Sequence, residues 1–439
     1  MNIIFIGQRS FDGLSAALVS DVSVIVSCDQ LQCDSLLGLK LEIRSLESEG
    51  CSRSPWTSSD IDLLSDILIE KVSLGEDNIL LPYSSSSSMD DIGEKFKLDV
   101  LSPAFELQRS LDNKINNTKL FSSLGLPTTE RIYATPSESE YFYLRKLLGC
   151  SFVARAPYGS TGSTVHLIRN NLDMQRLVPY ESVWMFERYI EGISINVNAV
   201  VFENSTVTYE PSIQISGISD LSDRPFGFCG NDFTAARNIN KRMLAECRRQ
   251  TVSIGESMAS LSYRGIMGVD FIIADDHEVY PLEVNPRFQN STALLNIMYK
   301  NQPDISPTQL HIQSYEKCSS PSKKISADCD LNQLIVNAPT QYSDYIVVKS
   351  VVDGVYSLAT LDCSSPGLVF PNTLDDDSFI VVGAPMSGST IRADSMMFKM
   401  LSRSALLNQD EQTIKAGWRS VIKKIKQRFD LRSFEHDEE

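Results

Sequence analysis

Short apolar runs and a helical repeat alternate over the first hundred residues of the chain. Apolar runs at residues 2–6 (NIIFI), 22–26 (VSVIV) and 78–83 (NILLPY) have the length of buried strands. Between the second and third runs, residues 60–72 repeat apolar side chains at helical spacing. Strands that alternate with helices predict an α/β unit over residues 1–105.

The loops after these runs carry few ligand-binding signals. Five serines, Ser84–Ser88, follow the third run, and we predict a plain loop there because small polar residues between periodic segments mark turns. The alternative is a ligand-binding loop at the carboxyl end of a strand. Gly7 and Gly13 follow the first run without completing a GxGxxG pattern, so the sequence lacks a dinucleotide-binding fingerprint.

From residue 106 onward the pattern changes to longer helices and paired strands. It predicts, in chain order, a helix, two strands joined by the small-residue loop PYGSTGS, two more strands, a long helix and a β-hairpin. The expected ranges are 110–124, 151–154, 164–168, 183–186, 194–202, 239–261, 268–274 and 279–285.

The last part of the chain is predicted to form a small β-rich unit. Residues 318–330 are polar and rich in serine, which favours a linker. Strand-like runs follow at 345–352, 355–361 and 379–383. The chain ends in a predicted helix that we expect to dock on its own domain, although a membrane surface or a partner is the alternative. Its apolar face would carry Trp418, Val421, Ile422, Ile425 and Phe429, and its basic face Lys415, Arg419, Lys423, Lys424 and Lys426.

Length and charge limit the function classes. The chain has 439 residues, more than the roughly 250–300 that a single hydrophobic core supports, so we expect two or three units. Apolar residues make up 42% and charged residues 22%, the balance of a folded globular protein. The formal net charge of −16 would repel a nucleic-acid backbone, which argues against nucleic-acid binding.

Targeting and redox signals favour a cytoplasmic protein. No stretch approaches the ~20 apolar residues of a membrane span, and polar residues from Gln8 onward end the first apolar run. We therefore expect no membrane association. The nine cysteines form no CxxC pair and four histidines accompany them, so free thiols are predicted rather than a zinc site.

The predicted hairpin at residues 268–285 collects the strongest candidate chemistry. Asp270 lies on its first strand, and Glu283 and Asn285 lie two residues apart on its second, so these two share a face. Carboxylate and amide oxygens suit Mg²⁺, which often takes further ligands from nucleotide phosphates. Arg287 follows and could hold a transferring phosphoryl group. The alternative is an ordinary hairpin with surface acids, but facing carboxylates on a half-buried strand pair are costly without a cation.

This hairpin, with its LEVNPR ending, resembles the magnesium-binding hairpin of the ATP-grasp superfamily. Three further segments match that superfamily in the same order. Lys114, in LDNKINNTKLFSSLGLP, is similar to its first nucleotide-binding lysine. Arg155, in GCSFVARAPYGSTGS, stands where its second phosphate-binding cation precedes a glycine loop, and FERYIEG (186–192) resembles the hinge that clasps the adenine.

The resemblance implies an α/β (α+β) chain with the ATP-grasp fold. It places a Rossmann-like pre-ATP-grasp domain at residues 1–105 and an ATP-grasp domain at 106–320, with a lid subdomain at about 125–190. The segment GAPMSGSTIRADSMMFKMLSRS is similar to the small β-rich domain of some members, which implies a C-terminal domain with a terminal helix at 330–439.

The same resemblance implies a site for ATP and two Mg²⁺ ions. The metal ligands would be Asp270, Glu283 and Asn285, and the catalytic residues Arg287, Asn290 and Ser291. The nucleotide would be bound by Lys114, Arg155, Gly159, Ser160, Thr161, Gly162 and Ser163, and by the hinge residues Glu187, Arg188, Tyr189, Ile190 and Glu191. Two positions depart from the superfamily pattern, because most relatives carry lysine at Arg155 and many carry a ribose-binding glutamate at Ser194.

The continuation NPRFQNSTALLN resembles the peptide ligases typified by the pheganomycin ligase and related amino-acid ligases of antibiotic biosynthesis. The implied enzyme activates a carboxylate as an acyl phosphate and joins it to an amine of an amino acid or peptide, with ADP and phosphate as products. The implied partners are small-molecule carboxylate and amine substrates, with a peptide, a carrier protein and a homodimer left open. Glu210 and Gln214 are candidate acceptor contacts.

Three other functions share parts of this pattern. A carboxylate–thiol ligase that loads an acyl carrier protein or CoA would use the same chemistry up to the acyl phosphate. A biotin-dependent or purine-pathway carboxylase would share the metal hairpin, but the sequence after Arg287 lacks the Val-Glu-His run that such enzymes carry. A nucleotide-binding regulator without turnover would not need Asp270, Glu283 and Asn285 intact. No GxSxG, HExxH or GxxxxGK[ST] motif supplies another catalytic set.

Overall fold

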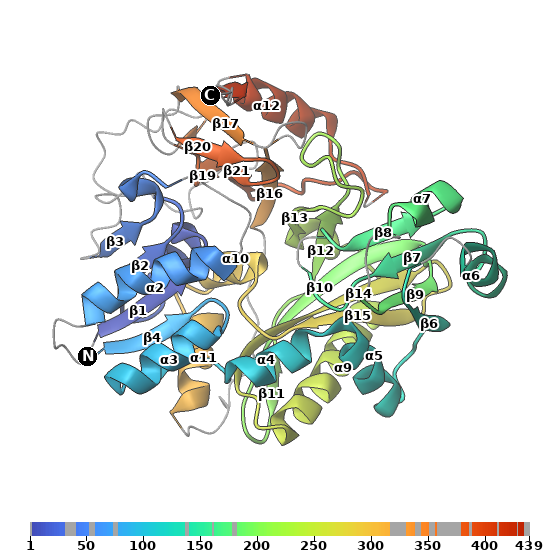
Figure 1. The fold of residues 1–439 in the computed structure, drawn as a ribbon, viewed down its shortest axis with the longest axis horizontal. Helices are drawn as coiled ribbons and strands as arrows, with labels where there is room; N and C mark the ends of the chain where they lie inside the picture. The colour runs from blue at the N-terminus through green and yellow to red at the C-terminus, as the bar shows by residue number, and fades with distance from the viewer. Residues whose placement is uncertain are drawn as a thin grey trace.

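The computed structural model shows four β-sheets and the helices that cover them (Figure 1). The described residues are 2–30, 41–51, 58–72, 78–136, 140–159, 162–177, 182–316, 331–338, 344–350, 356–357, 379–385, 389–410, 412–427 and 429–433. A parallel sheet comes first and antiparallel sheets follow, so the predicted α/β (α+β) class is confirmed. Within the described ranges, no helix is long and apolar enough to span a membrane.

The N-terminal unit is a parallel sheet with helices on both faces. Its elements are β1 (Asn2–Gly7), α1 (Ser10–Ala17), β2 (Val22–Ser27), β3 (Glu42–Ser45), η1 (Glu47–Glu49), α2 (Ser58–Val72), β4 (Asn78–Pro82), α3 (Ser87–Phe96) and β5 (Asp99–Val100). The strand order is β3-β2-β1-β4-β5. Ile3 and Phe5 of β1 pack in one apolar cluster with α1, and Ile4 and Ile6 pack in another with α2 and α3. The apolar run is therefore buried on both faces, as in parallel sheets generally.

The strands predicted at 2–6, 22–26 and 78–83 and the helix predicted at 60–72 are confirmed. The serine run differs from the plain loop that was expected. Ser86 is the N-cap of α3, where its hydroxyl accepts a hydrogen bond from the backbone N–H of Met89 at 3.2 Å, and the last two serines belong to the helix. Serine favours this position because its oxygen satisfies a donor that the first helical turn leaves free.

The large sheet forms the centre of the molecule. Its order is β15-β14-β10-β12-β13-β16-β21-β19-β18, with β11 beside β10. Its strands are β10 (Gly192–Val201), β11 (Thr206–Thr208), β12 (Ser212–Ser216), β13 (Phe228–Asp232), β14 (Gly265–Ala274), β15 (Val279–Asn285), β16 (Asn332–Asn337), β18 (Tyr356–Ser357), β19 (Phe379–Val382) and β21 (Met396–Ser402).

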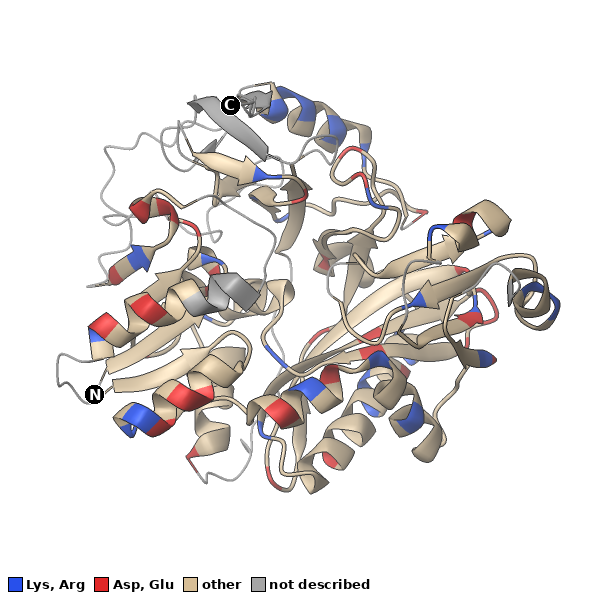
Figure 2. Ribbon diagram, in the orientation of Figure 1, with Lys and Arg blue, Asp and Glu red and all other residues tan. Residues whose placement is uncertain are grey.

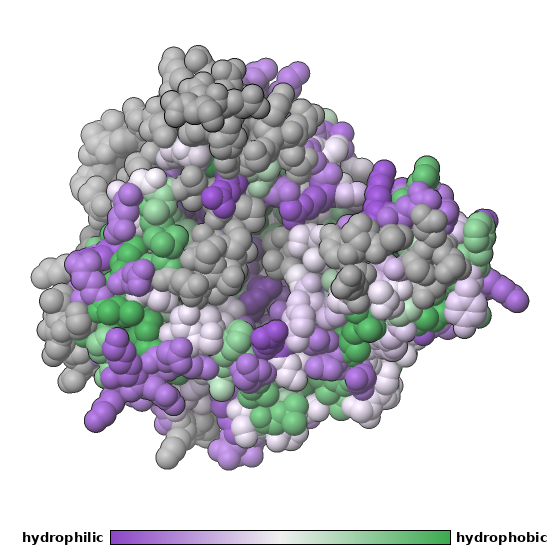
Figure 3. Space-filling view, viewed as in Figure 1, coloured by the Kyte–Doolittle hydropathy of each residue, from purple (hydrophilic) through white to green (hydrophobic). Residues whose placement is uncertain are grey.

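Helices cover both faces of this sheet. They are α4 (Phe105–Asp112), α5 (Lys114–Ser123), α8 (Phe233–Ala236), α9 (Lys241–Ser260), α10 (Asn290–Met298), η2 (Pro303–Ile305) and α11 (Pro307–Tyr315). Helix α9 packs on one face, and α10 and α11 lie on the other, where α10 also contacts α1. Hydrophilic residues line the hollow between the N-terminal unit and this part of the molecule (Figure 3).

The single helix predicted at 110–124 is wrong in one respect. The chain forms two helices, α4 and α5, because Asn113 adopts an extended conformation (φ −71°, ψ 116°) between them. Its side chain accepts hydrogen bonds from the backbone N–H groups of Ile115 and Asn116 at 3.0 and 3.2 Å, which caps α5. The predicted helix at 239–261 and the hairpin at 268–285 are confirmed as α9 and as β14 with β15.

A four-stranded antiparallel sheet lies beside the β14–β15 hairpin, in the range predicted for a lid, and we call it the lid after that prediction (Figure 1). The lid contains β6 (Arg131–Ala134), α6 (Glu140–Leu148), β7 (Phe152–Arg155), β8 (Val165–Ile168), α7 (Asn171–Gln175) and β9 (Trp184–Arg188), in the strand order β6-β9-β7-β8. Phe152, Trp184 and Phe186 are buried in its own core. The two strands predicted on either side of PYGSTGS are confirmed as β7 and β8, which pair antiparallel.

The C-terminal part continues the large sheet. β16 pairs with β13, so four strands from this part extend the sheet without a break. A separate sheet contains β17 (Asp344–Ser350), β20 (Thr390–Arg392) and β22 (Phe429–Ser433). Of the predicted strand at 355–361, the described residues are 356–357, which form β18. The predicted linker at 318–330 lies outside the described residues.

Helix α12 (Ala416–Lys426) docks on its own domain as predicted. Trp418, Ile422 and Ile425 are buried, and the ring of Trp418 lies 6.0 Å from that of Phe379. Its basic residues, blue in Figure 2, include Arg419, Lys423, Lys424 and Lys426, whose side chains are exposed. The placement of Phe429 on this helix was wrong, because the helix ends at Lys426 and Phe429 begins β22.

Candidate active site

A cleft of about 680 Å³ lies between the lid, the hinge and the large sheet. Most of the residues that the sequence singled out line it. From the lid and hinge these are Arg155, Gly162, Glu187, Arg188, Tyr189, Ile190 and Glu191, and from the hairpin and the segment after it Asp270, Glu283, Asn285, Arg287, Asn290 and Ser291. Residues far apart in the chain therefore share one concave site.

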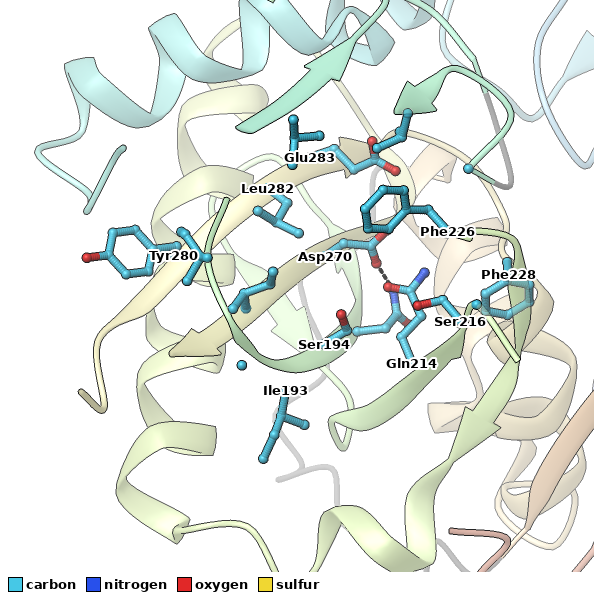
Figure 4. Close-up of a pocket in the computed structure, with 18 of the residues that line it drawn as sticks. Ile193, Ser194, Gln214, Ser216, Phe226, Phe228, Asp270, Tyr280, Leu282 and Glu283 are labelled. Atoms are coloured by element: carbon cyan, nitrogen blue, oxygen red, sulfur yellow. Dashed lines mark hydrogen bonds between the residues drawn. The ribbon is translucent and has the colours of Figure 1, made fainter. Parts of the chain in front are cut away.

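The β14–β15 pair brings the three predicted oxygen donors together. Asp270 is directly opposite Glu283 in the antiparallel register (Figure 4). Asn285 is opposite Gly268. The amide nitrogen of Asn285 donates to Oδ2 of Asp270 at 3.2 Å. Asn196, on the neighbouring strand β10, donates to Oδ1 of Asp270 at 2.7 Å. Two carboxylates and an amide thus meet on one face of the sheet.

The two carboxylates have opposite pKa shifts. Burial raises the pKa of Asp270 to about 7, and the negative charge of Glu283 adds to this effect. Burial also favours the neutral acid at Glu283, but the charges of Lys114 and Arg155 outweigh it and lower its pKa to about 2. Asp270 therefore lacks the cationic partners that Glu283 has, and a divalent ion between the two would supply one.

This donor set fits Mg²⁺. No group of three or more His, Cys, Asp or Glu side chains that could hold a metal ion occurs among the described residues. Mg²⁺ typically binds through one or two carboxylates and completes its coordination with phosphate oxygens and water. Asp270 and Glu283 supply the carboxylates, and Asn285 supplies a neutral oxygen.

Two buried cations contact Glu283. Nζ of Lys114 lies 3.2 Å from Oε2 of Glu283 and donates to the carbonyl of Gly159 at 2.8 Å. Arg155 donates from Nη2 to Oε2 of Glu283 at 2.8 Å and from Nη1 to Glu187 at 3.1 Å. The buried Nε of Arg155 has no hydrogen-bond partner within the described part of the chain. Both cations thus stand beside the carboxylate of Glu283, where a phosphate chain could replace part of its contacts.

Local sequence fixes Lys114 in this position. It is the first residue of α5, directly after the cap at Asn113. One turn later, Asn117 accepts a hydrogen bond from the backbone N–H of Val284 and donates to the carbonyl of Leu111 at 2.6 Å. The start of α5 is therefore attached to the end of β15, and Lys114 is 4% exposed.

The small-residue loop between β7 and β8 contains two described glycines, and one of them lies close to the segment before β13. Gly159 and Gly162 have positive φ angles of 146° and 74°, which glycine adopts without strain. A Cβ at Gly162 would collide with the carbonyl of Phe226, which precedes β13. Ser163 belongs to the described part of this loop, whereas Ser160 and Thr161 lie outside the described residues.

The hinge connects the lid to the large sheet. β9 ends at Arg188 and β10 begins at Gly192, so Tyr189, Ile190 and Glu191 form the connection, and all three line the cleft. Glu187 has a different environment, because its buried carboxylate pairs with Arg155 and with Arg131 at 3.2 Å. Ser194 lines the cleft two residues beyond the start of β10.

Arg287 contacts one of the three oxygen donors, while Ser291 belongs to a hydrogen-bond network. Nη2 of Arg287 donates to Oδ1 of Asn285 at 3.0 Å. The hydroxyl of Ser291 donates to Asn196 at 3.0 Å and accepts from Asn198 at 2.8 Å. Its hydrogen bonds connect α10 to β10, and Asn290 lines the cleft at the start of the same helix.

Sequence reasoning missed several residues of this site. Asn196 contacts both Asp270 and Gln289, at 2.7 Å each, and Asn198 continues the network. The signal was present, because SINVNAV places polar side chains at every second position of an apolar strand, all on one face. Of the two candidate acceptor contacts, Gln214 lines the cleft, whereas Glu210 pairs with Arg248 at 3.0 Å.

Asp112 is a further missed group, and no sequence motif marked it. It ends α4, and burial is the main cause that raises the pKa of its carboxyl, with a contribution from the charge of Glu283. Arg287 and Lys114 oppose this shift. Asp112 therefore lies within electrostatic range of the proposed phosphate cations and of Arg287.

The sequence of this chain is similar to those of known ATP-grasp proteins. Residues 111–291 match the family model described as an ATP-grasp domain. A curated relative, the [butirosin acyl-carrier protein]–L-glutamate ligase of Niallia circulans, is 22% identical over 258 residues, which cover 56% of this chain. The match spans 61% of the length of that ligase.

Solved structures share the fold at low sequence identity. The N5-carboxyaminoimidazole synthase of Aspergillus clavatus, in complex with ADP and its ribonucleotide, superposes with a TM-score of 0.59 at 10% identity, covering 96% of this chain and 98% of that one. Biotin carboxylase of Campylobacter jejuni superposes with a TM-score of 0.60 at 14% identity, covering 98% and 92%. These similarities establish the fold.

Proposed function

Because the chain carries an ATP-grasp domain over residues 111–291, we propose that it is an ATP- and Mg²⁺-dependent ligase that joins a carboxylate to an amine. The amine would belong to an amino acid or a peptide, and the product would be an amide. We also propose the division into a pre-ATP-grasp domain at 1–105, an ATP-grasp domain at 106–320 with a lid at about 125–190, and a C-terminal domain at 330–439.

One observation supports this proposal above the others. Asp270 and Glu283 are opposite each other on β14 and β15, and the buried cations Lys114 and Arg155 contact Glu283. A Mg²⁺–triphosphate needs hard oxygen ligands for the metal and cations for the phosphates, and this group of side chains offers both within a few ångströms. An ion-pair network that only stabilised the fold would not require a second buried carboxylate, Asp270, that has amide partners but no described ion pair.

The reaction we propose has two steps. The substrate carboxylate attacks the terminal phosphorus of ATP, which forms an acyl phosphate and releases ADP. The amine then attacks the acyl carbon, the C–O bond to phosphate breaks, and the amine loses its proton to give an amide and inorganic phosphate. Mg²⁺ would neutralise charge on the transferred group. Arg287, beside Asn285, would hold the reacting oxygens, because a guanidinium can bind two of them at once.

We assign the remaining roles by position. The connection Tyr189–Glu191 would bind the adenine through its backbone, and the described glycine-loop residues Gly159, Gly162 and Ser163 would cover the phosphates. Ser160 and Thr161, between them in the chain, keep the same proposed role. Asn290 would contact the substrate at the start of α10, and Ser291 would orient the site through Asn196 and Asn198 in addition to any substrate contact.

A carboxylate–thiol ligase is the second candidate. The observation in its favour is the similarity to the butirosin ligase, whose name assigns it an acyl-carrier protein as partner. Transfer to a carrier thiol would use the same acyl phosphate and would release the same phosphate. Under this alternative the product would be a thioester, which hydroxylamine cleaves at neutral pH, whereas an amide resists it.

The experiment is a substrate-dependent turnover assay. The chain is incubated with ATP, Mg²⁺ and a mixture of amino acids and dipeptides, and ADP, phosphate and new masses are measured. ADP and phosphate that form in equal amounts with an amide product support the proposal. Phosphate release that requires a thiol-bearing carrier supports the second candidate. Absence of any acid-dependent ADP would contradict both and favour a nucleotide-binding regulator.

A further inference from the structure

The cleft continues beyond the metal-binding hairpin to an end formed by β12, β13 and their connecting loop. In the close-up, Tyr280 and Phe228 mark opposite ends, with Asp270 between them (Figure 4). Tyr280 and Ile193, which follows the hinge in the chain, lie on one side of Asp270, whereas Gln214, Ser216 and Phe226 lie with Phe228 on the other. A nucleotide that reaches from the hinge to Asp270 would leave this second end for another substrate.

We define the amide end of the cleft by six of the residues that line it: Gln214, Phe226, Phe228, Asn231, Asn290 and Gln412. Gln214, Phe226 and Phe228 lie together in Figure 4, Asn231 is opposite Gln214 in the β12–β13 register, and α10, which begins at Asn290, contacts β13. Four of these six residues carry a carboxamide, which offers one acceptor and two donor N–H groups. The other two are half-buried aromatic rings.

Three carboxamides at this end are available to a ligand. Within the described structure, the side chains of Gln214, Asn290 and Gln412 make no hydrogen bond. Asn231 differs, because it donates to Ser212 at 3.0 Å and accepts from Gln333 at 3.0 Å, which fixes its orientation in the floor. A rigid polar floor below three free amides suits a ligand with its own amide or hydroxyl groups.

Charged side chains are confined to the other parts of the cleft. Among the described residues that line it, the acids and bases come from the lid, the hinge, the hairpin and the segment that follows it, and none comes from residues 213–231 or from Leu407 and Gln412. Arg287 lines the cleft next to Asn285 and would pair with the reacting carboxylate. A charged substrate side chain at the amide end would lose its hydration without gaining an ion pair, and this loss costs binding free energy.

The lid closes against this end. Gly162 packs so closely on the carbonyl of Phe226 that a Cβ would not fit between them. Bulk water would therefore be reduced around a bound substrate when the lid adopts this position, and the penalty for an unpaired charge would rise.

We propose that the amide end selects a carboxylate substrate whose side chain is uncharged, either a neutral amino acid with an amide or hydroxyl group or a peptide with neutral residues. Its polar groups pair with Gln214, Asn290 and Gln412, and its apolar atoms pack on Phe226 and Phe228. The inference rests on the proposed ligase function, because it concerns the substrate of that same site.

The first test uses the native chain and pairs of nearly isosteric acids. Acyl phosphate is trapped with hydroxylamine as a hydroxamate, which avoids any need to know the natural amine. Glutamine is compared with glutamate, asparagine with aspartate, and the same pairs are placed at the carboxyl end of glycyl dipeptides. We expect kcat/KM for the neutral member to be at least ~10-fold higher, because the added carboxylate would lose its hydration without gaining a cationic partner.

Two results would overturn the inference in different ways. Equal or higher kcat/KM for the acidic members would reject neutral selection while the ligase function stands. Hydroxamate from none of the acids would reject carboxylate activation itself, and with it the inference.

A charge change at Gln214 provides the second test. In Gln214→Arg the preference should move toward glutamate and aspartate by ~10-fold or more, because the guanidinium would pair with the added carboxylate. The affinity for ADP should stay within about twofold, since the hinge and the hairpin are unchanged. Gln427→Arg, an exposed residue after α12, is the matched control and should leave the preference as it is. An unchanged preference in a folded Gln214→Arg chain would contradict the assignment of this end.

Discussion

Asp270 and Glu283 are directly opposite each other on β14 and β15, yet their carboxyl groups have pKa values of about 7 and about 2. The difference follows from the position of the cations, because Lys114 and Arg155 both contact Glu283. Asp270 has amide partners in Asn196 and Asn285 instead. The site therefore has a fully compensated carboxylate beside one that lacks a cation, which is the arrangement that a divalent ion would complete.

Glu283→Gln tests the role of the compensated carboxylate. We expect acid-dependent ADP release to fall by at least ~10²- to 10³-fold, because the amide removes the charge that holds the metal. The fold should persist, since glutamine keeps the side-chain shape and an acceptor for Lys114 and Arg155. Turnover and the circular dichroism spectrum are measured on the same sample. Full activity of the folded variant would contradict the metal assignment.

Arg155→Lys and Arg155→Ala separate charge from geometry. Arg155 bridges Glu187 of the lid and Glu283 of the hairpin through two different nitrogens, at 3.1 and 2.8 Å. Lysine keeps the charge but cannot form this fork, so we expect partial activity and a KM for ATP raised ~10-fold. Alanine should raise it further. Arg145, exposed on α6, provides the control substitution Arg145→Ala. Nucleotide affinity that is the same in Arg155→Ala and the native chain would show that this cation does not bind phosphate.

Gly162→Ala tests the closed position of the lid. The new methyl group would meet the carbonyl of Phe226, and the φ of 74° disfavours a side chain in any case. Gly149→Ala is the matched control, because Gly149 also belongs to the lid and has a φ of 101°, but no described atom lies within 4 Å of the position that a methyl group would take there. We expect both variants to lose roughly 1 kcal/mol of stability. A fall in kcat/KM for the acid should occur in Gly162→Ala alone, and equal falls would reject the lid contact.

We predict that the free energy of unfolding depends on pH through His311, which lies outside the active site. Burial lowers the pKa of this imidazole from 6.5 to about 4. Its Nδ1 accepts from the backbone N–H of Ile266 at 2.9 Å, so Nε2 donates to the carbonyl of Leu101 at 2.8 Å, which joins α11 to β14 and to the N-terminal unit.

The unfolded chain binds a proton at His311 below about pH 6.5, whereas the folded chain does so near pH 4. Stability should therefore fall as the pH decreases through this window, by up to about 3 kcal/mol from this group. His311→Gln cannot titrate, so the stability difference between the native chain and the variant should shrink between pH 7 and pH 4.5. The measurement is the free energy of unfolding by urea, and a pH-independent difference would contradict the prediction.

The hairpin could be predicted from sequence because its chemistry is local. Two apolar runs joined by a short polar turn place Asp270 opposite Glu283, and alternation places Asn285 on the same face as Glu283. The lid strands and α9 were predictable for the same reason. In contrast, the break at Asn113 depends on one side chain that caps a new helix, and an uninterrupted helical repeat concealed it.

Long-range pairing could not be predicted in the same way. β13 pairs with β16 across a hundred residues, with Gly230 opposite Leu334, so the C-terminal strands extend the central sheet. Nothing in either segment specifies the other. The amide end could not be predicted for the same reason, because Gln214 and Asn290 line one cleft from elements that are distant in the chain. Phe429 was misplaced because its apolar side chain fitted the helical spacing, although the residue begins a strand.

Binding of a divalent ion together with nucleotide tests the central claim most directly. Mn²⁺ replaces Mg²⁺ as the probe, and its binding is followed by electron paramagnetic resonance in the presence of ADP for the native chain, Asp270→Asn and Glu283→Gln. We predict that the native chain binds Mn²⁺ when ADP is present, that both variants lose this binding by ~10-fold or more, and that all three chains keep their fold. Equal Mn²⁺ binding by the three chains would contradict the proposed role of the hairpin.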